Sequence, residues 1–193
     1  MIARPQPAYQ GQMTVEEFLA FTDTRPDEER WELIEGVPVL SPAPVQLHQL
    51  IAANIVSFLG EQKATIEASW LPLLGVGTRV PASPRSLPQP DVYVQAGAAA
   101  DSPVTDDALV IFEVLSRSNT AADQAWRKRV YSSVPNCAHY VTVSQKAASV
   151  SAFDRATDWR ERKIHGLDAS LDLPALDLSL PLSRLYRWTS IAS

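Results

Sequence analysis

The chain has 193 residues, of which 46% are hydrophobic and 20% charged, and this usage is that of a globular protein rather than a disordered one. The formal net charge of −5 counts against an extended nucleic-acid-binding surface, although a local basic patch can override the overall sign. Cys137 is the one cysteine, so an intramolecular disulfide is excluded. No apolar stretch approaches the roughly 20 residues that span a bilayer, and we expect a soluble, cytoplasmic protein with no membrane contact.

The chain length suits one domain with a sizeable hydrophobic core, which we expect to occupy residues 13–193. Residues 1–12 are polar and contain prolines, so we expect a flexible N-terminal arm there. The 15 prolines of the chain lie mostly between apolar runs. This punctuation favours many short elements over a few long helices.

The first half of the domain predicts two helices, a hairpin and further strands. Residues 14–17 have the pattern of a capping box, which would begin a short helix. The segments Trp31–Ile34 and Val37–Leu40 flank Glu35-Gly36 and predict a strand, a turn and a second strand. Apolar side chains at helical spacing within residues 47–59 predict the clearest amphipathic helix of the chain. Further strands are predicted at residues 65–70, 76–80 and 91–95.

The second half begins with residues 109–115 (LVIFEVL), an almost continuously apolar run that is typical of a central strand buried on both faces. A helix is predicted over residues 120–132, with Thr120 as N-cap and Asp123 in its first turn. Later strands are predicted at residues 140–144, 149–154 and 159–164, apolar stretches at 171–173 and 176–182, and a helical turn at 183–186. This order predicts an α/β (α+β) fold with a mixed central β-sheet flanked by helices and additional antiparallel strands.

Two carboxylates stand out within these strands. Asp91 follows Pro90 at the start of a predicted strand, and Glu113 lies 113 − 91 = 22 residues later, in the next strongly apolar strand. A carboxylate in a buried strand is costly unless it is paired or holds a metal. Acids on neighbouring strands can share a hard cation such as Mg²⁺. Two simpler interpretations stay open: Asp91 as a loop or cap residue, and Glu113 as a buried ion pair with Arg127 or Lys128.

The order of several motifs resembles the Uma-type restriction endonucleases, a bacterial family long filed under unknown function, within the PD-(D/E)XK nuclease superfamily. The matching segments span nearly the whole chain, and their order and spacing together make the resemblance specific. They are MTVEEFLAF, WELIEGVPVLSPAP followed by His48, Pro90-Asp91-Val92, IFEVLSRSN, Asp123, Tyr131, VPNCAHYVTVSQ and the tail GLDASLDLPALDLSLPLSRLY.

The resemblance implies a restriction-endonuclease-like core that hydrolyses phosphodiester bonds in DNA with Mg²⁺ or Mn²⁺. Asp91 would correspond to the PD aspartate and Glu113 to the (D/E)XK acid, so both are expected to hold the metal. Glu32, in WELIEG, matches a glutamate near the same site. His48 matches a family histidine and would bind substrate or metal, with a surface or capping role as an equal alternative.

One departure concerns the lysine that the superfamily motif places two residues after the acid, because Leu115 stands there. In the family a lysine on the following helix, four residues before a tyrosine, takes its place. Here the residue four before Tyr131 is Arg127, with Lys128 next to it. Successive helical residues are turned by about 100°, so the two basic side chains point in different directions. An arginine can clamp a phosphate but cannot act as a base, whereas a lysine with a lowered pKa could.

Other candidates lie near these residues. Arg127 could instead form a helix-surface pair with Asp123. Arg129 extends a basic-aromatic cluster that could contact a phosphate backbone, or it is a solvated helix residue. Ser116 follows the acidic strand and either lines the site or caps the next helix.

The main hypothesis is therefore a magnesium-dependent endodeoxyribonuclease. Asp91 and Glu113 would hold the ion, Glu32 would assist, and Arg127 or Lys128 would bind phosphate. The rival hypothesis is a catalytically impaired member that binds nucleic acid or a protein partner, which the acidic charge and the missing lysine favour. A third is a structural homo-oligomer, with a dimer formed through residues 140–144 and the later strands.

Overall fold

The computed structural model describes residues 12–116 and 119–192, so the predicted N-terminal arm lies almost entirely outside the described residues. Its centre is a six-stranded mixed sheet in the order β10-β9-β8-β7-β5-β3. These strands are β3 (Trp70–Leu74), β5 (Val92–Ala96), β7 (Val110–Val114), β8 (His139–Val143), β9 (Ser149–Asp154) and β10 (Glu161–His165). Only the β7–β8 pair among them is parallel, and the other pairs are antiparallel.

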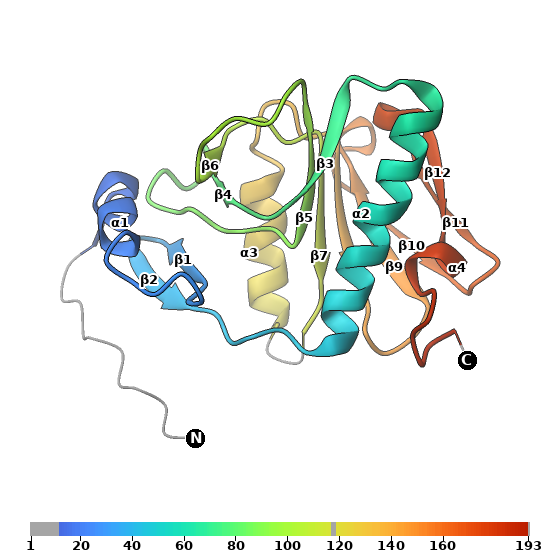
Figure 1. The fold of residues 1–193 in the computed structure, drawn as a ribbon, viewed down its shortest axis with the longest axis horizontal. Helices are drawn as coiled ribbons and strands as arrows, with labels where there is room; N and C mark the ends of the chain where they lie inside the picture. The colour runs from blue at the N-terminus through green and yellow to red at the C-terminus, as the bar shows by residue number, and fades with distance from the viewer. Residues whose placement is uncertain (1–11, 117–118, 193) are drawn as a thin grey trace.

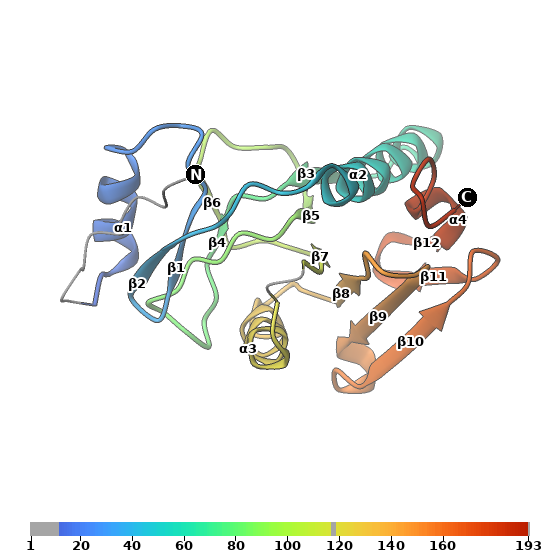
Figure 2. The same cartoon turned by 90° about the horizontal axis from the view of Figure 1, so that it is seen from below.

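Two helices cover opposite faces of this sheet (Figures 1 and 2). The long helix α2 (Gln46–Ile66) packs on the face that carries Val92 and Phe112. The face with Tyr93 and Ile111 packs against α3 (Ala121–Tyr131). Successive strand residues point to opposite faces, so a strand covered on both sides is apolar throughout. This confirms the predicted fold class and the central position of β7.

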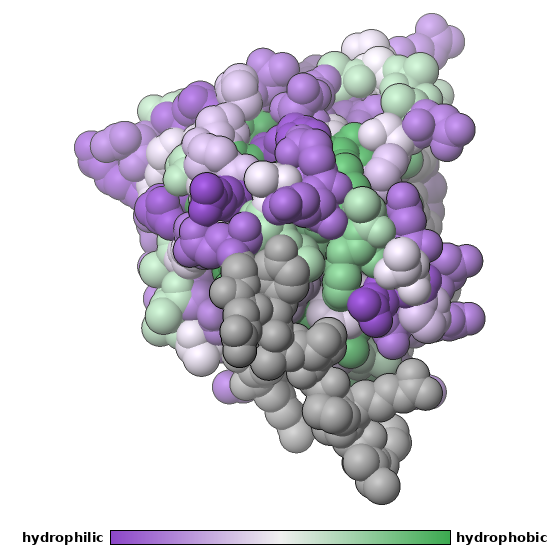
Figure 3. Space-filling view, turned by 90° about the vertical axis from the view of Figure 1, so that its left-hand side faces the viewer, coloured by the Kyte–Doolittle hydropathy of each residue, from purple (hydrophilic) through white to green (hydrophobic). Residues whose placement is uncertain are grey.

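A third core joins α1 (Val15–Thr22) to the hairpin of β1 (Trp31–Ile34) and β2 (Val37–Leu40). The predicted capping box is present, because Thr14 and Glu17 each accept a hydrogen bond from the other's backbone N–H. Positive φ angles at Glu35 and Gly36 form the tight turn between the strands, as predicted. The face that carries these elements is largely hydrophilic, with hydrophobic patches between the polar side chains (Figure 3).

Two predicted strands between α2 and β5 are wrong. Of residues 65–70, Thr65 and Ile66 form the end of α2, where Thr65 donates its hydroxyl to the carbonyl of Glu61, and the strand β3 begins only at Trp70. Only Gly77–Thr78 of residues 76–80 forms a strand, β4, which pairs in parallel with β6 (Val104–Thr105) outside the central sheet. Local β-propensity was overridden in both segments. The helix α2 extends into residues 65–70, and the strand within residues 76–80 pairs with β6 rather than with the central sheet.

The C-terminal segment closes the α2 face. The hairpin of β11 (Ser170–Leu173) and β12 (Leu178–Pro181) leads into α4 (Leu182–Leu185), whose buried leucines join the α2 core. β10 is an edge strand, as its charged residues predict. β8 has a hydrogen-bonded neighbour on each side and offers no edge for pairing across a dimer, so the predicted dimer stays a prediction for the later strands, of which β10 lies at the edge. Within the described residues no helix is long and apolar enough to cross a membrane.

Candidate functional site

Asp91 and Glu113 lie side by side at one end of neighbouring strands. Asp91 directly precedes β5, and β5 runs antiparallel to β7, which carries Glu113. The backbone N–H of Asp91 donates to the carbonyl of Phe112 at 3.2 Å, and the N–H of Val114 donates to Asp91 Oδ2 at 2.8 Å. Both carboxylates are buried, with 8% and 7% of each residue exposed. The fold therefore brings the two predicted acids together.

A cavity of about 930 Å³ is lined by both acids together with Glu32, His48 and Arg127. The loops that follow β7 and β8 complete its wall. Their lining residues are Ser116, Asn119, Ser144, Gln145 and Lys146.

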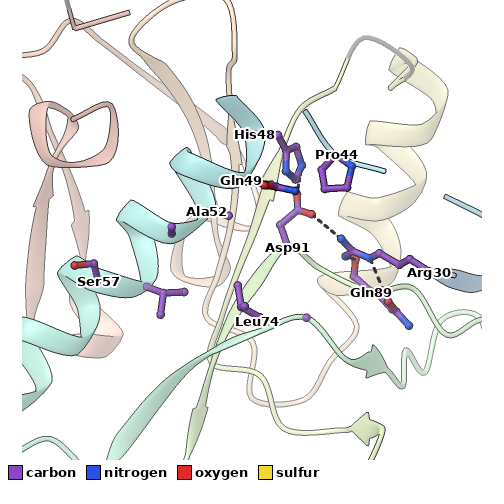
Figure 4. Close-up of a pocket in the computed structure, with 12 residues that line it drawn as sticks. Arg30, Pro44, His48, Gln49, Ala52, Ser57, Leu74, Gln89 and Asp91 are labelled. Atoms are coloured by element: carbon purple, nitrogen blue, oxygen red, sulfur yellow. Dashed lines mark hydrogen bonds and ion pairs between the residues drawn. The ribbon is translucent and has the colours of Figure 1, made fainter. Parts of the chain in front are cut away.

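Asp91 is held by two basic side chains from different elements (Figure 4). His48, in the first turn of α2, places Nε2 3.1 Å from Asp91 Oδ2, and Arg30 places Nη1 3.4 Å from Oδ1. Burial would raise the pKa of Asp91, but the hydrogen bond and charge of His48, the N–H of Val114 and the charge of Arg30 outweigh it. The pKa of Asp91 therefore lies below its usual value, and this carboxylate is ionised at neutral pH.

Arg127 bridges the other two acids. Its Nη2 donates to both carboxylate oxygens of Glu32, at 3.0 and 2.8 Å, and its Nη1 donates to Glu113 Oε1 at 2.9 Å. Burial would lower the pKa of Arg127, but the charges of Glu113, Tyr131 and Glu32 raise it well above its ordinary value. Arg127 is thus a permanent cation and cannot serve as a proton acceptor.

Glu113 has the opposite balance of forces. Burial raises its pKa to about 7, and the negative charges of Asp91 and Glu32 act in the same direction. The charge of Arg127 and the hydroxyl of Tyr131, which donates to Oε1 at 2.9 Å, lower the pKa only in part. Burial is the largest of these influences, so the ionised form of Glu113 would be favoured by any further positive charge beside it.

The β1–β2 hairpin is docked onto the site through Glu32. Besides Arg127, Glu32 accepts hydrogen bonds from the backbone N–H of Gln89 at 2.7 Å and the hydroxyl of Ser41 at 3.3 Å. Arg30 donates to the carbonyl of Gln89 at 2.9 Å and to its side-chain oxygen at 3.2 Å. The sequence prediction missed Arg30 and Gln89. A signal existed, because each stands two residues before a predicted acid, where an extended chain points side chains to the same side.

Helix α3 separates the basic residues that sequence spacing left open. Arg127 faces the acids, whereas Lys128 Nζ lies 4.8 Å from the ring centre of Phe153 and Arg129 pairs with Glu35 at 3.3 Å. Neither Lys128 nor Arg129 lines the cavity. Geometry thus removes both from direct contact with the acids and leaves Arg127 as the basic residue of α3 there.

Asp123 and Ser116 serve the ends of local elements. Asp123 closes a capping box with Thr120, accepting its backbone N–H at 2.9 Å, while the ion pairs of Arg127 go to Glu32 and Glu113. Ser116 lines the cavity and also donates its N–H to Asn119 Oδ1 at 2.6 Å. Of the two predicted alternatives for Ser116, lining the cavity agrees with the structure, whereas capping the next helix is wrong because the N-cap of α3 is Thr120.

The donor set fits one divalent ion held by Asp91 and Glu113. Within the described residues no three His, Cys, Asp or Glu side chains gather as a ready-made metal cluster, since Arg127 lies between Glu32 and Glu113. However, the hydrogen bonds that Glu113 accepts from described residues all end on Oε1, and Asp91 Oδ1 has one long contact of 3.4 Å. Two carboxylates with water suit Mg²⁺ or Mn²⁺, which favour oxygen ligands.

Comparison with known proteins gives a consistent picture. The family model Uma2, described as "Putative restriction endonuclease", matches residues 15–183. The chain is also similar to a crystal structure from Anabaena variabilis ATCC 29413, described as "a putative nuclease belonging to DUF820". The two share 17% identity with a TM-score of 0.73, over 91% of this chain and 98% of that one, which shows a common fold. No curated protein matches the chain.

Proposed function

The chain belongs to the Uma2 family, and on this premise we propose that it is an endonuclease that hydrolyses DNA phosphodiester bonds with Mg²⁺ or Mn²⁺. The observation that carries the proposal is the pairing of Asp91 and Glu113 at one end of β5 and β7, on the wall of a large cavity. When held by these two carboxylates, a divalent ion supplies Lewis-acid chemistry at a phosphate and lowers the pKa of water.

Asp91 and Glu113 are set up for this work in different ways. The contacts from His48 and Arg30 keep Asp91 ionised and fix its orientation. Glu113, with its raised pKa, gains most from a neighbouring positive charge, which would favour its ionised form. His48 thus acts as a positioning residue for Asp91.

Arg127 is the proposed phosphate clamp. A guanidinium presents several N–H groups in one plane and matches the oxygens of a phosphate. Glu32 holds two of these groups and so fixes the orientation of that plane at the cavity wall. Arg127 would then stabilise the negative charge that develops on the phosphate in the transition state.

A second candidate function is that of a non-cleaving member that binds nucleic acid or protein. The observation that favours it is the contact of Arg127 with both Glu32 and Glu113, which neutralises much of the acidic cluster without a metal. Leu115, in place of the superfamily lysine, points the same way.

Cleavage of supercoiled plasmid DNA with Mg²⁺ or Mn²⁺ separates the two functions. We expect the wild type to cut, and Asp91→Ala and Glu113→Ala each to lower the rate by about a hundredfold or more. Asp101→Asn, which changes an exposed carboxylate outside the cavity, is the matched control. Cleavage that survives both alanine variants would contradict the assigned site, and a wild type that binds DNA without cutting it favours the second function.

A further inference from the structure

A second cavity, of about 590 Å³, adjoins the acidic cluster. It lies between α2 and the end of β3 and shares five residues with the larger cavity (Figure 4). The shared residues are Arg30, Pro44, His48, Gln89 and Asp91. Its volume falls within the roughly 300–1,000 Å³ of typical small-molecule sites.

The wall of this cavity away from the acids is apolar. Small side chains on α2, Ala52 and Ala53, leave the space open, and Val56 and Leu74 supply larger apolar surfaces. Leu74 is 64% exposed at the end of an edge strand. A ligand that covered Leu74 would remove apolar surface from water, which favours binding.

Polar groups are confined to the ends of the cavity. Gln49 reaches toward Asp91 and His48 at one end, whereas Ser57 lies at the other (Figure 4). In the part of the chain that the structure describes, the side-chain amide of Gln49 makes no hydrogen bond, and neither does the side-chain nitrogen Nε2 of Gln89. These amides are therefore available to a ligand in the cavity.

We propose that this cavity receives an unstacked nucleobase of the nucleic-acid substrate, while the adjoining phosphate lies at Arg127 and the acidic cluster. A nucleotide carries a charged group at one end and a flat apolar group with polar edges at the other, which is the order of groups along the two joined cavities. Bases held outside a duplex are bound in this manner, between apolar side chains and with hydrogen bonds to their edges. The inference rests on the proposed function, because it assigns the phosphate to the same acidic site.

Ala53 offers a direct test because it is an exposed residue of α2 that lines the cavity, so Ala53→Phe would fill the space without disturbing the core. Ala64→Phe is the matched control, since Ala64 is an exposed alanine of the same helix outside the cavity. Titration calorimetry with millimolar Mn²⁺ would compare deoxyadenosine 5′-monophosphate with deoxyribose 5-phosphate, which lacks the base.

We expect the wild type and Ala64→Phe to bind the nucleotide about tenfold more tightly than the sugar phosphate. Ala53→Phe should bind both equally weakly. Equal affinities in the wild type, or equal behaviour of the two phenylalanine variants, would overturn the inference even if DNA cleavage depends on Asp91 and Glu113. A base preference that Ala53→Phe removes, together with cleavage that survives both acid substitutions, would overturn the proposed function and retain the nucleotide cavity.

Discussion

Two buried charged clusters in this fold differ in how completely their charges are matched. The cluster of His139, Asp154 and Arg162 ties β8, β9 and β10 together: His139 Nδ1 lies 2.6 Å from Asp154 Oδ1, and Arg162 lies 3.3 Å from Oδ2. His139 Nε2 also accepts the backbone N–H of Ala175 at 3.3 Å. None of these side chains lines either of the two cavities.

The cluster at the end of β5 and β7 has instead three carboxylates, of which Glu113 keeps a pKa of about 7. It opens onto a cavity of about 930 Å³. A matched cluster is explained by its structural role, whereas a cluster on a cavity wall with three carboxylates against two arginines and His48 leaves room for a cationic ligand. This difference directs the search for function to Asp91 and Glu113.

The largest effect on stability is expected at the cation of the acidic cluster. Arg127→Met would leave Glu32 and Glu113 buried without their partner and should lower the free energy of unfolding by about 3–5 kcal/mol. Arg162→Ala, whose side chain is 40% exposed, should cost less than about 1 kcal/mol. Urea denaturation measures both, and equal losses would remove the distinction between the clusters. Adding Glu113→Gln to Arg127→Met should recover part of the loss.

The pH dependence of stability should come next in size. The pKa of Glu113 is raised in the folded state, from 4.5 to about 7, so the folded protein binds a proton more tightly than the unfolded chain. The contribution of Glu113 to stability, up to about 3 kcal/mol, is therefore full below pH 4.5 and is lost as the pH rises to 7. Glu113→Gln should flatten this slope in metal-free denaturation curves, while Asp101→Asn should keep it. An unchanged slope in Glu113→Gln would contradict the raised pKa of Glu113.

The matched cluster should show a smaller, purely structural effect. His139→Leu leaves Asp154 Oδ1 and the N–H of Ala175 without their partner and should lower the free energy of unfolding by about 1–3 kcal/mol. DNA cleavage per folded molecule should stay at the wild-type level. A loss of cleavage in a folded His139→Leu variant would show that this cluster also serves the reaction.

Much of the fold could be predicted from short-range patterns. Thr14 and Thr120 begin their helices through capping boxes, and Glu35-Gly36 forms the predicted turn. The strand predicted over residues 65–70 was wrong. Its β-branched residues stand at the end of α2, where tertiary packing stabilises the helix in spite of their local propensity.

From its own surroundings alone, one residue of the candidate site could be predicted, and the others followed from spacing and from the family resemblance. Glu113 stands out because a charged residue in an apolar strand is costly. Arg30 and Gln89 are polar residues in polar stretches of the sequence and do not stand out in this way. The contact between them joins positions 59 residues apart. Their spacing from Glu32 and Asp91 indicates the same side of the chain, but the contact between them depends on how the β1–β2 hairpin docks. Which of Arg127 and Lys128 faces the acids likewise followed from the rotation of α3 in the fold.

Metal binding tests the central claim most directly. Calorimetric titration with Mn²⁺ should show one ion bound at millimolar concentration or below by the wild type and by Asp154→Asn, which alters only the matched cluster. Asp91→Asn and Glu113→Gln should each abolish that binding. A wild type that binds no ion, or an affinity that neither substitution changes, would contradict the assignment of Asp91 and Glu113 as the metal-binding residues.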